Sequence, residues 1–150
     1  MAKDNTIRIH RVFAASPEKV YRALTDADAM TKWLAPNGFT CHVDSMDVKV
    51  GGTYKMSFTN FTTGKQYGFS GVYKELVPNE RMRYIDKFDD PNMPGEMPVT
   101  ITLKAVSVGT DFTVVQENLP DIMPVEGCYQ GWQDTMNNLA RLVEPDIKDD

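Results

Sequence analysis

The 150-residue sequence predicts an α+β fold in which an antiparallel sheet curls around one long C-terminal helix. Three observations lead to this prediction. Apolar and polar residues alternate through residues 39–117, with turn residues between the segments, which is typical of short strands joined by hairpins. Two short segments of helical spacing precede this region, and one long segment follows it. Because a chain of this size forms one core, the economical arrangement packs the final helix against the inner face of the sheet.

The N-terminal part predicts a strand followed by two short helices. Residues 5–14 alternate with the period of a strand, although Arg11 falls on the apolar side, which suggests a strand end or an internal ion pair. Ser16 precedes Pro17, and this pair is typical of a helix start because the hydroxyl caps free N–H groups and proline needs none in the first turn. Asp26 is expected to cap the second helix in the same way.

Six further strands are predicted from the alternating region, and glycine, proline or asparagine punctuates most of the segments between them. They cover residues 39–49, 53–61, 66–77, 81–89, 97–107 and 110–118. The first of the six is expected to bend near Ser45. A final helix is predicted over residues 124–144, because apolar residues recur there at intervals of three and four. Residues 146–150 are expected to form a solvated acidic tail.

The amino-acid composition limits the classes of protein to which this chain can belong. Hydrophobic residues at 41% and charged residues at 25% are ordinary for a globular chain and argue against disorder. The 21 acidic residues outnumber the 16 basic ones, and the net charge of −5 opposes non-specific binding of nucleic acid. No apolar run approaches the roughly 18 residues of a membrane span, and the N-terminus lacks a signal-peptide pattern, so we expect a cytoplasmic protein.

The residues that usually carry metal or cofactor chemistry form no motif in this sequence. Two cysteines, Cys41 and Cys128, and two histidines, His10 and His42, lack the spacing of a zinc site. The glycine-rich and nucleophile motifs of common enzymes are also absent. We therefore expect no metal and no cofactor, and the sequence leaves open whether the protein is an enzyme.

A curled sheet and one helix need not fill the space between them, so the predicted interior is also the candidate binding site. Aromatic and methionine side chains recur on one face of three successive strands. These side chains either simply fill the core or line a pocket, and both interpretations can hold at once. We expect an apolar cavity lined by Trp33, Met56, Phe58, Phe69, Tyr84, Phe88, Trp132 and Met136.

Two polar residues interrupt apolar strand faces within this region. A buried carboxylate at Asp86 has to be paired, protonated or near water. Asp86 is therefore part of a structural salt bridge, a sign that the predicted strand register is wrong, or a weak candidate for orienting a ligand or for acid–base catalysis. Gln116 is expected to bond either a ligand carbonyl or a cross-strand partner. His42 and Glu117 are weaker candidates, because alternation turns them outward.

Gly127 and Gly131 lie four residues apart, on one side of the predicted final helix. Each costs roughly 1 kcal/mol relative to alanine in a helix interior. Either a close backbone approach or open space at the mouth of the cavity would explain them, and the sequence leaves both alternatives open.

Several stretches, taken in order, carry a resemblance that covers almost the whole chain. They are FAASPEKVYRALTDADAMTKW (13–33), VGGTY (50–54), GFSGVYKELVPNERM (68–82), GT (109–110) and GWQDTMNNL (131–139). The sequence resembles the START-like (SRPBCC) helix-grip superfamily, and more narrowly the family of homologues of the activator of the heat-shock-protein-90 ATPase. This resemblance implies one START-like domain over residues 1–150, with a seven-stranded sheet gripping the last helix and an apolar cavity between them.

The resemblance implies a choice of functions rather than one, since START-like proteins include lipid and sterol carriers, hormone receptors, polyketide aromatases and cyclases, and co-chaperone domains. Function must therefore be argued from the site. We expect first a protein that binds a small hydrophobic molecule in the cavity. The alternatives are a co-chaperone-like module that contacts the 90-kDa chaperone, and a cyclase- or aromatase-like enzyme that uses Asp86.

Overall fold

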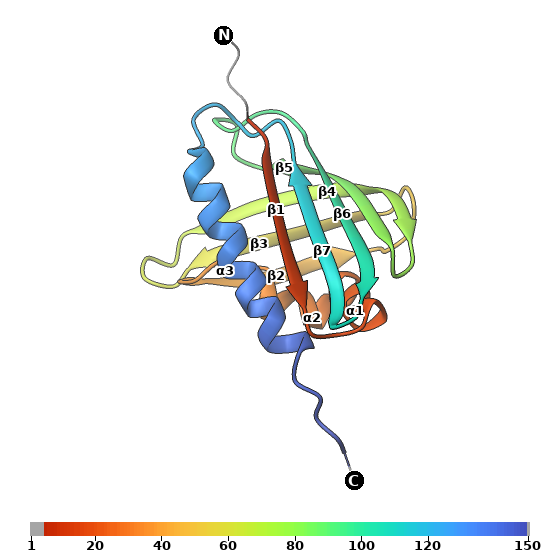
Figure 1. The fold of residues 1–150 in the computed structure, drawn as a ribbon. Helices are drawn as coiled ribbons and strands as arrows, with labels where there is room; N and C mark the ends of the chain where they lie inside the picture. The colour runs from red at the N-terminus through yellow and green to blue at the C-terminus, as the bar shows by residue number, and fades with distance from the viewer. Residues whose placement is uncertain (1–4, 150) are drawn as a thin grey trace.

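Residues 5–149 are described by the computed structural model, and they form a seven-stranded antiparallel sheet and three helices (Figure 1). In chain order the elements are β1 (Ile7–Phe13), α1 (Pro17–Thr25), α2 (Ala27–Trp33), β2 (Phe39–Met46), β3 (Thr53–Asn60), β4 (Gln66–Val77), β5 (Arg81–Phe88), β6 (Met97–Val106), β7 (Gly109–Gln116) and α3 (Val125–Val143). The sheet order is β1-β7-β6-β5-β4-β3-β2, so each strand from β2 to β6 pairs with the next one along the chain, and β7 also pairs with β1. The predicted α+β architecture is confirmed.

The predicted bounds of the elements lie within three residues of the observed ones, and the largest difference is at the end of β2. That strand ends at Met46 rather than at residue 49, because the chain turns back there and the Gly52 N–H donates to the Lys49 carbonyl at 2.8 Å. The predicted bend near Ser45 is confirmed as a shift of register between Val43 and Ser45. Of the predicted tail, residues 146–149 form no helix or strand, and residue 150 lies outside the described residues.

Both predicted helix starts are confirmed by hydrogen bonds. The Ser16 hydroxyl accepts from the Lys19 N–H at 3.2 Å, and an Asp26 carboxylate oxygen accepts from the Ala29 N–H at 2.9 Å. These bonds satisfy N–H groups that have no partner inside the helix.

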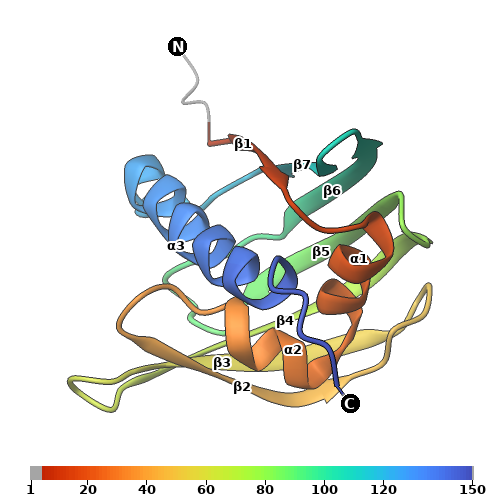
Figure 2. The ribbon, with the colours of Figure 1, turned by 60° about the horizontal axis from the view of Figure 1, so that its bottom comes forward.

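The sheet curls, and α3 lies along its concave side, as Figure 2 shows. The backbone of helix α3 approaches that of β1, α1 and α2 but not that of the central strands β3 to β6, which it reaches only through side chains. Arg11 on β1 donates a hydrogen bond to Asn137 of α3 at 2.6 Å, and within residues 5–149 it forms no ion pair. The helix is therefore held at the β1 edge and by the short helices, and it stands off from the middle of the sheet.

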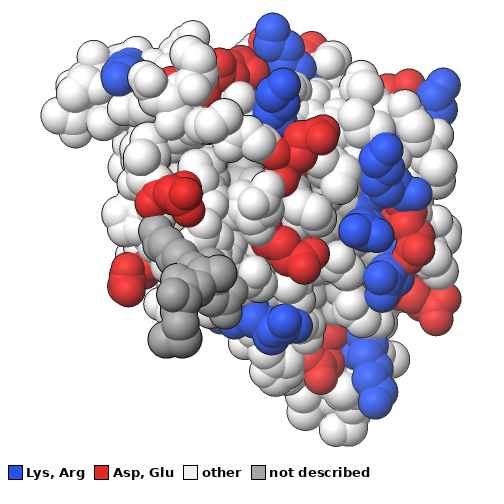
Figure 3. All heavy atoms as spheres, turned by 90° about the horizontal axis from the view of Figure 1, so that it is seen from above, with Lys and Arg blue, Asp and Glu red and all other residues white. Residues whose placement is uncertain are grey.

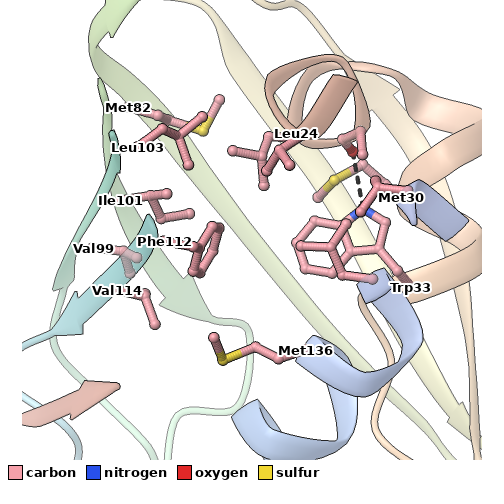
Figure 4. Packing of buried hydrophobic residues seen from close by; sticks show 14 of the residues in the cluster. Leu24, Met30, Trp33, Met82, Val99, Ile101, Leu103, Phe112, Val114 and Met136 are labelled. Atoms are coloured by element: carbon pink, nitrogen blue, oxygen red, sulfur yellow. Dashed lines mark hydrogen bonds between the residues drawn. The ribbon is translucent and has the colours of Figure 1, made fainter. Parts of the chain in front are cut away.

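Buried side chains of the concave sheet face and of the three helices form the main core (Figure 4). Within it, Phe13 and Phe112 meet edge to face, with ring centroids 5.5 Å apart. A smaller cluster of Ile7, Met97 and Leu119 lies under the start of α3. None of the helices described for this chain is long and apolar enough to cross a membrane.

Candidate functional site

An apolar cavity of about 150 Å³ lies between the concave face of the sheet and the helices. Figure 4 shows side chains of the sheet, such as Val99 and Ile101, extending toward Leu24, Met30 and Trp33 of the short helices across this space. Strands β3 to β6 contribute most of the wall, because alternate residues of a strand point to the same face. The full lining consists of Leu24, Met30, Trp33, Leu34, Tyr54, Met56, Phe58, Phe69, Tyr73, Met82, Tyr84, Asp86, Phe88, Val99, Ile101, Gln116 and Trp132.

Seven of the eight side chains expected at the cavity border it, and Met136 does not. Met136 is 2% exposed and belongs to the main core. Figure 4 shows its side chain extending from α3 toward Phe112 and Val114 of β7, so it fills the space between helix and sheet there. The expectation that Met136 lines the cavity is therefore corrected: one helical turn beyond Trp132, the interior is filled by side chains.

Tyr54, Gly71 and Asp86 lie in one row across three neighbouring strands, since Tyr54 pairs with Gly71 and Gly71 pairs with Asp86. The Tyr54 hydroxyl donates to the Asp86 carboxylate at 2.5 Å. This bond requires a glycine between them, because a Cβ at position 71 would overlap the Tyr54 hydroxyl and the Ile85 carbonyl oxygen. The row was not predicted as a unit, although a glycine inside an alternating strand was the signal of a close approach.

Asp86 borders the cavity and is half-buried, with no Lys or Arg bonded to it among residues 5–149. Burial raises the pKa of this carboxyl from 3.8 to about 6, and the hydrogen bonds from the Tyr54 hydroxyl and the Lys87 backbone N–H oppose the rise. The structure thus does not give Asp86 the salt bridge that was one of the predicted alternatives. At pH values above about 6 it holds a negative charge inside an apolar cavity.

Tyr54, the donor to Asp86, packs against two further tyrosines of the cavity wall. The ring centroid of Tyr54 lies 5.4 Å from that of Tyr73 and 5.8 Å from that of Tyr84. Burial raises the pKa of all three phenols above the ordinary value of 10, and the charge of Asp86 raises it further for Tyr54 and Tyr84. The three hydroxyls therefore remain neutral hydrogen-bond donors near neutral pH.

The Gln116 amide and both indole N–H groups of the cavity wall are hydrogen-bonded within the protein. The Trp132 indole N–H donates to the Gln116 side-chain oxygen at 2.8 Å, and the Gln116 amide donates to the Met97 sulfur at 3.4 Å. The Trp33 indole N–H donates to the Ala23 carbonyl at 2.9 Å, drawn as a dashed line in Figure 4. Gln116 therefore faces inward and is bonded to both α3 and a neighbouring strand.

The remaining sequence candidates lie away from the cavity. The His42 side chain is 72% exposed and lies 3.2 Å from Asp44, and Glu117 is exposed, as alternation predicted for both. No group of three or more His, Cys, Asp or Glu side chains within residues 5–149 could hold a metal ion.

A surface groove of about 640 Å³ adjoins the cavity and shares Phe58 and Phe88 with it. The groove lies between the end of the β3–β4 hairpin, the loop after β5 and the start of α3, where Gly127 lines it. A Cβ at Gly127 would meet no atom closer than 3.9 Å, and one at Gly131 would meet none within 4 Å. Both glycines thus leave open space, Gly127 in the groove itself, and neither is required by a close backbone approach.

Figure 3 shows the end of the molecule at which α3 begins. Acidic and basic side chains are interspersed on this face, and neither kind forms a continuous patch. In the groove itself, two carboxylates, Asp89 and Asp90, accompany one ammonium group, Lys65.

Comparison with known proteins agrees with this architecture. The family model described as Activator of Hsp90 ATPase homolog 1-like protein matches residues 14–144. A crystal structure of a protein from Chromobacterium violaceum is 55% identical, with a TM-score of 0.94 over 95% of this chain and 99% of that one. More distant structures share the fold, among them a protein from Rhodobacter sphaeroides (22% identical, TM-score 0.82, 93% of this chain and 92% of that one). An AHSA1-like protein from Aeromonas hydrophila is 20% identical, with a TM-score of 0.74 over 93% of this chain and 92% of that one. No curated protein matches.

Proposed function

This chain belongs to the family of Activator of Hsp90 ATPase homolog 1-like proteins, and from its cavity we propose that it binds a small apolar molecule between the sheet and α3. The main support for this proposal is the apolar cavity itself. No side chain fills it, although the side chains around it are packed against one another. The proposed contact residues are Trp33, Met56, Phe58, Phe69, Tyr84, Phe88 and Trp132.

The size of the cavity limits the ligand. A dry apolar cavity of about 150 Å³ has room for one benzene ring, and this is the volume of the cavity here. A longer molecule would have to pass Phe58 and Phe88 and continue into the adjoining groove. We therefore expect a ligand that places one ring, or an aliphatic group of similar size, between Trp33 and Trp132.

Two matched variants test the proposal with indole as the probe. Ile101 borders the cavity, whereas Leu103 lies two residues further along β6, is 5% exposed and does not border it. Ile101→Phe is expected to fill the cavity and abolish indole binding measured by calorimetry, while Leu103→Phe retains it. Wild-type protein with indole at 100 times its dissociation constant should gain about 2.7 kcal/mol of stability. Binding that survives in Ile101→Phe, or no binding of indole by the wild type, would contradict the proposal.

Contact with a chaperone is the second candidate, and the family match supports it. Such contact would use the outer surface, so it should not depend on the cavity. The test is stimulation of the ATPase of the 90-kDa chaperone by wild-type protein and by Ile101→Phe. Equal stimulation by both proteins would favour this second function, and no stimulation by either would exclude it.

A further inference from the structure

We infer that the ligand carries a protonated amine, which pairs with the carboxylate of Asp86 among the aromatic rings of the cavity wall. This inference rests on the proposed binding function and names the chemical class of the ligand. Its three supports are the unfilled bonding capacity of Asp86, the rings around it and the distribution of charge along the path into the cavity.

The carboxylate of Asp86 has acceptor capacity that the protein does not use. An ionised carboxylate offers about four acceptor positions. Asp86 receives the Tyr54 hydroxyl at 2.5 Å and the backbone N–H of Lys87. Both donors are neutral, and among residues 5–149 no Lys, Arg or His borders the cavity. The negative charge of this half-buried carboxylate thus has donors but no counter-ion, which is the environment that a ligand cation would complete.

The walls near Asp86 suit an ammonium group in a second way. Tyr84 and Phe88 flank Asp86 on β5. Phe69 lies on the adjacent strand β4 and Tyr54 on the strand after that, β3, with their ring centroids 6.5 Å apart. The faces of aromatic rings carry negative potential and attract cations within about 6 Å. A carboxylate set among several such rings favours a cation over a neutral molecule of the same shape.

The same features disfavour an anionic ligand such as a fatty acid. Its carboxylate would meet Asp86 with no basic side chain of the wall to neutralise either charge. The groove outside carries Asp89 and Asp90 against Lys65, and the Lys65 ammonium already lies 5.1 Å from the centre of the Tyr67 ring. Charge along this path therefore favours the approach of a cation.

Three one-ring probes of nearly equal size test the inference: benzylamine, benzyl alcohol and benzoate. At pH 7.5 we expect calorimetry to show that wild-type protein binds benzylamine at least about tenfold more tightly than benzyl alcohol, and benzoate most weakly. Asp86→Asn should lose this preference for the amine while its affinity for benzyl alcohol stays within about threefold. Asp44→Asn, which removes an exposed carboxylate outside both the cavity and the groove, should keep the preference.

A second measurement uses pH. The titratable side chains that face the cavity are Asp86, Tyr54, Tyr73 and Tyr84, and the three tyrosines stay neutral below pH 10. The affinity of wild-type protein for benzylamine should therefore fall between pH 7.5 and pH 5, as Asp86 becomes protonated. The affinity for benzyl alcohol should change little over this range.

The outcomes separate this inference from the binding function. Benzyl alcohol bound as tightly as benzylamine by wild-type protein, or an amine preference that persists in Asp86→Asn, overturns the inference and leaves the binding function standing. If neither the amine, the alcohol nor indole binds, both are overturned. Retained affinity of Asp86→Asn for benzyl alcohol would show that this variant is folded.

Discussion

At pH 8 the carboxylate of Asp86 carries a negative charge inside the cavity, and Asp86→Asn removes that charge while keeping an oxygen for the Tyr54 hydroxyl. The folded protein holds the pKa of this carboxyl at about 6, against 3.8 ordinarily, because burial disfavours the charged form. Folded protein therefore binds a proton more readily at this site than the unfolded chain does. The contribution of Asp86 to stability is present in full below about pH 4 and is lost as the pH rises through about 6.

The size of the effect follows from the two pKa values. One pH unit of difference corresponds to about 1.4 kcal/mol, so the ionised Asp86 lowers the free energy of unfolding at pH 8 by about 3 kcal/mol relative to a neutral group. The asparagine also changes hydrogen bonds, and this alters the free energy of unfolding by an amount that does not depend on pH. The stability of Asp86→Asn minus that of the wild type should thus increase by about 2 to 3 kcal/mol between pH 4 and pH 8.

Urea unfolding of both proteins at pH 4, 5, 6, 7 and 8 measures this difference, because all other carboxylates are common to the pair and cancel. Asp44→Asn removes a carboxylate that is 46% exposed, and it is expected to change stability by less than about 0.5 kcal/mol. Parallel pH profiles for wild-type protein and Asp86→Asn would refute the reasoning, as would a difference that shrinks toward pH 8.

Three further predictions concern the row of residues beside the cavity and the helices. Gly71→Ala should lower the free energy of unfolding, measured by urea titration, by at least about 2 kcal/mol, because its Cβ would overlap Tyr54 and a backbone carbonyl. Gly131→Ala, which meets open space, should raise it by up to about 1 kcal/mol. Equal effects of the two substitutions would contradict this prediction. Tyr54→Phe removes a bond that favours the ionised carboxylate, so an NMR titration should place the pKa of Asp86 above 6, and a lower value would contradict the assignment. Ser16→Ala should cost about 1 kcal/mol of stability, measured by thermal unfolding, and no loss would refute its role as a cap.

Local signals in the sequence predicted the elements well. The cap at Ser16 and the proline after it fix the start of α1 through bonds that span three residues. Alternation likewise places Met56 and Phe58 on one face of β3, because side chains of a strand point to opposite faces in turn. Such signals depend only on neighbours in the chain, and so a single sequence carries them.

The arrangement around Asp86 could not be predicted in this way. Its bond to Tyr54 depends on the register of two hairpins and on a register shift between Tyr73 and Glu75. A glycine at position 71 indicates a close approach but does not say which side chain approaches. The place of Met136 could not be predicted for a related reason. Met136 shares a helix face with Trp132, and only the packing against β7 decides which of the two side chains borders the cavity.

The pairing of β1 has a consequence for how the chain folds. Strands β2 to β7 each find a partner through a hairpin, but β1 pairs only with β7, roughly a hundred residues later. Contacts between residues so far apart form slowly, because the entropy of a large loop must be lost first. During synthesis on the ribosome, the first strand therefore has no place in the sheet until nearly the whole chain has emerged. Until β7 is available, the side chains of Ile7 and Phe13, both buried in the folded protein, lack the strand beside which they pack.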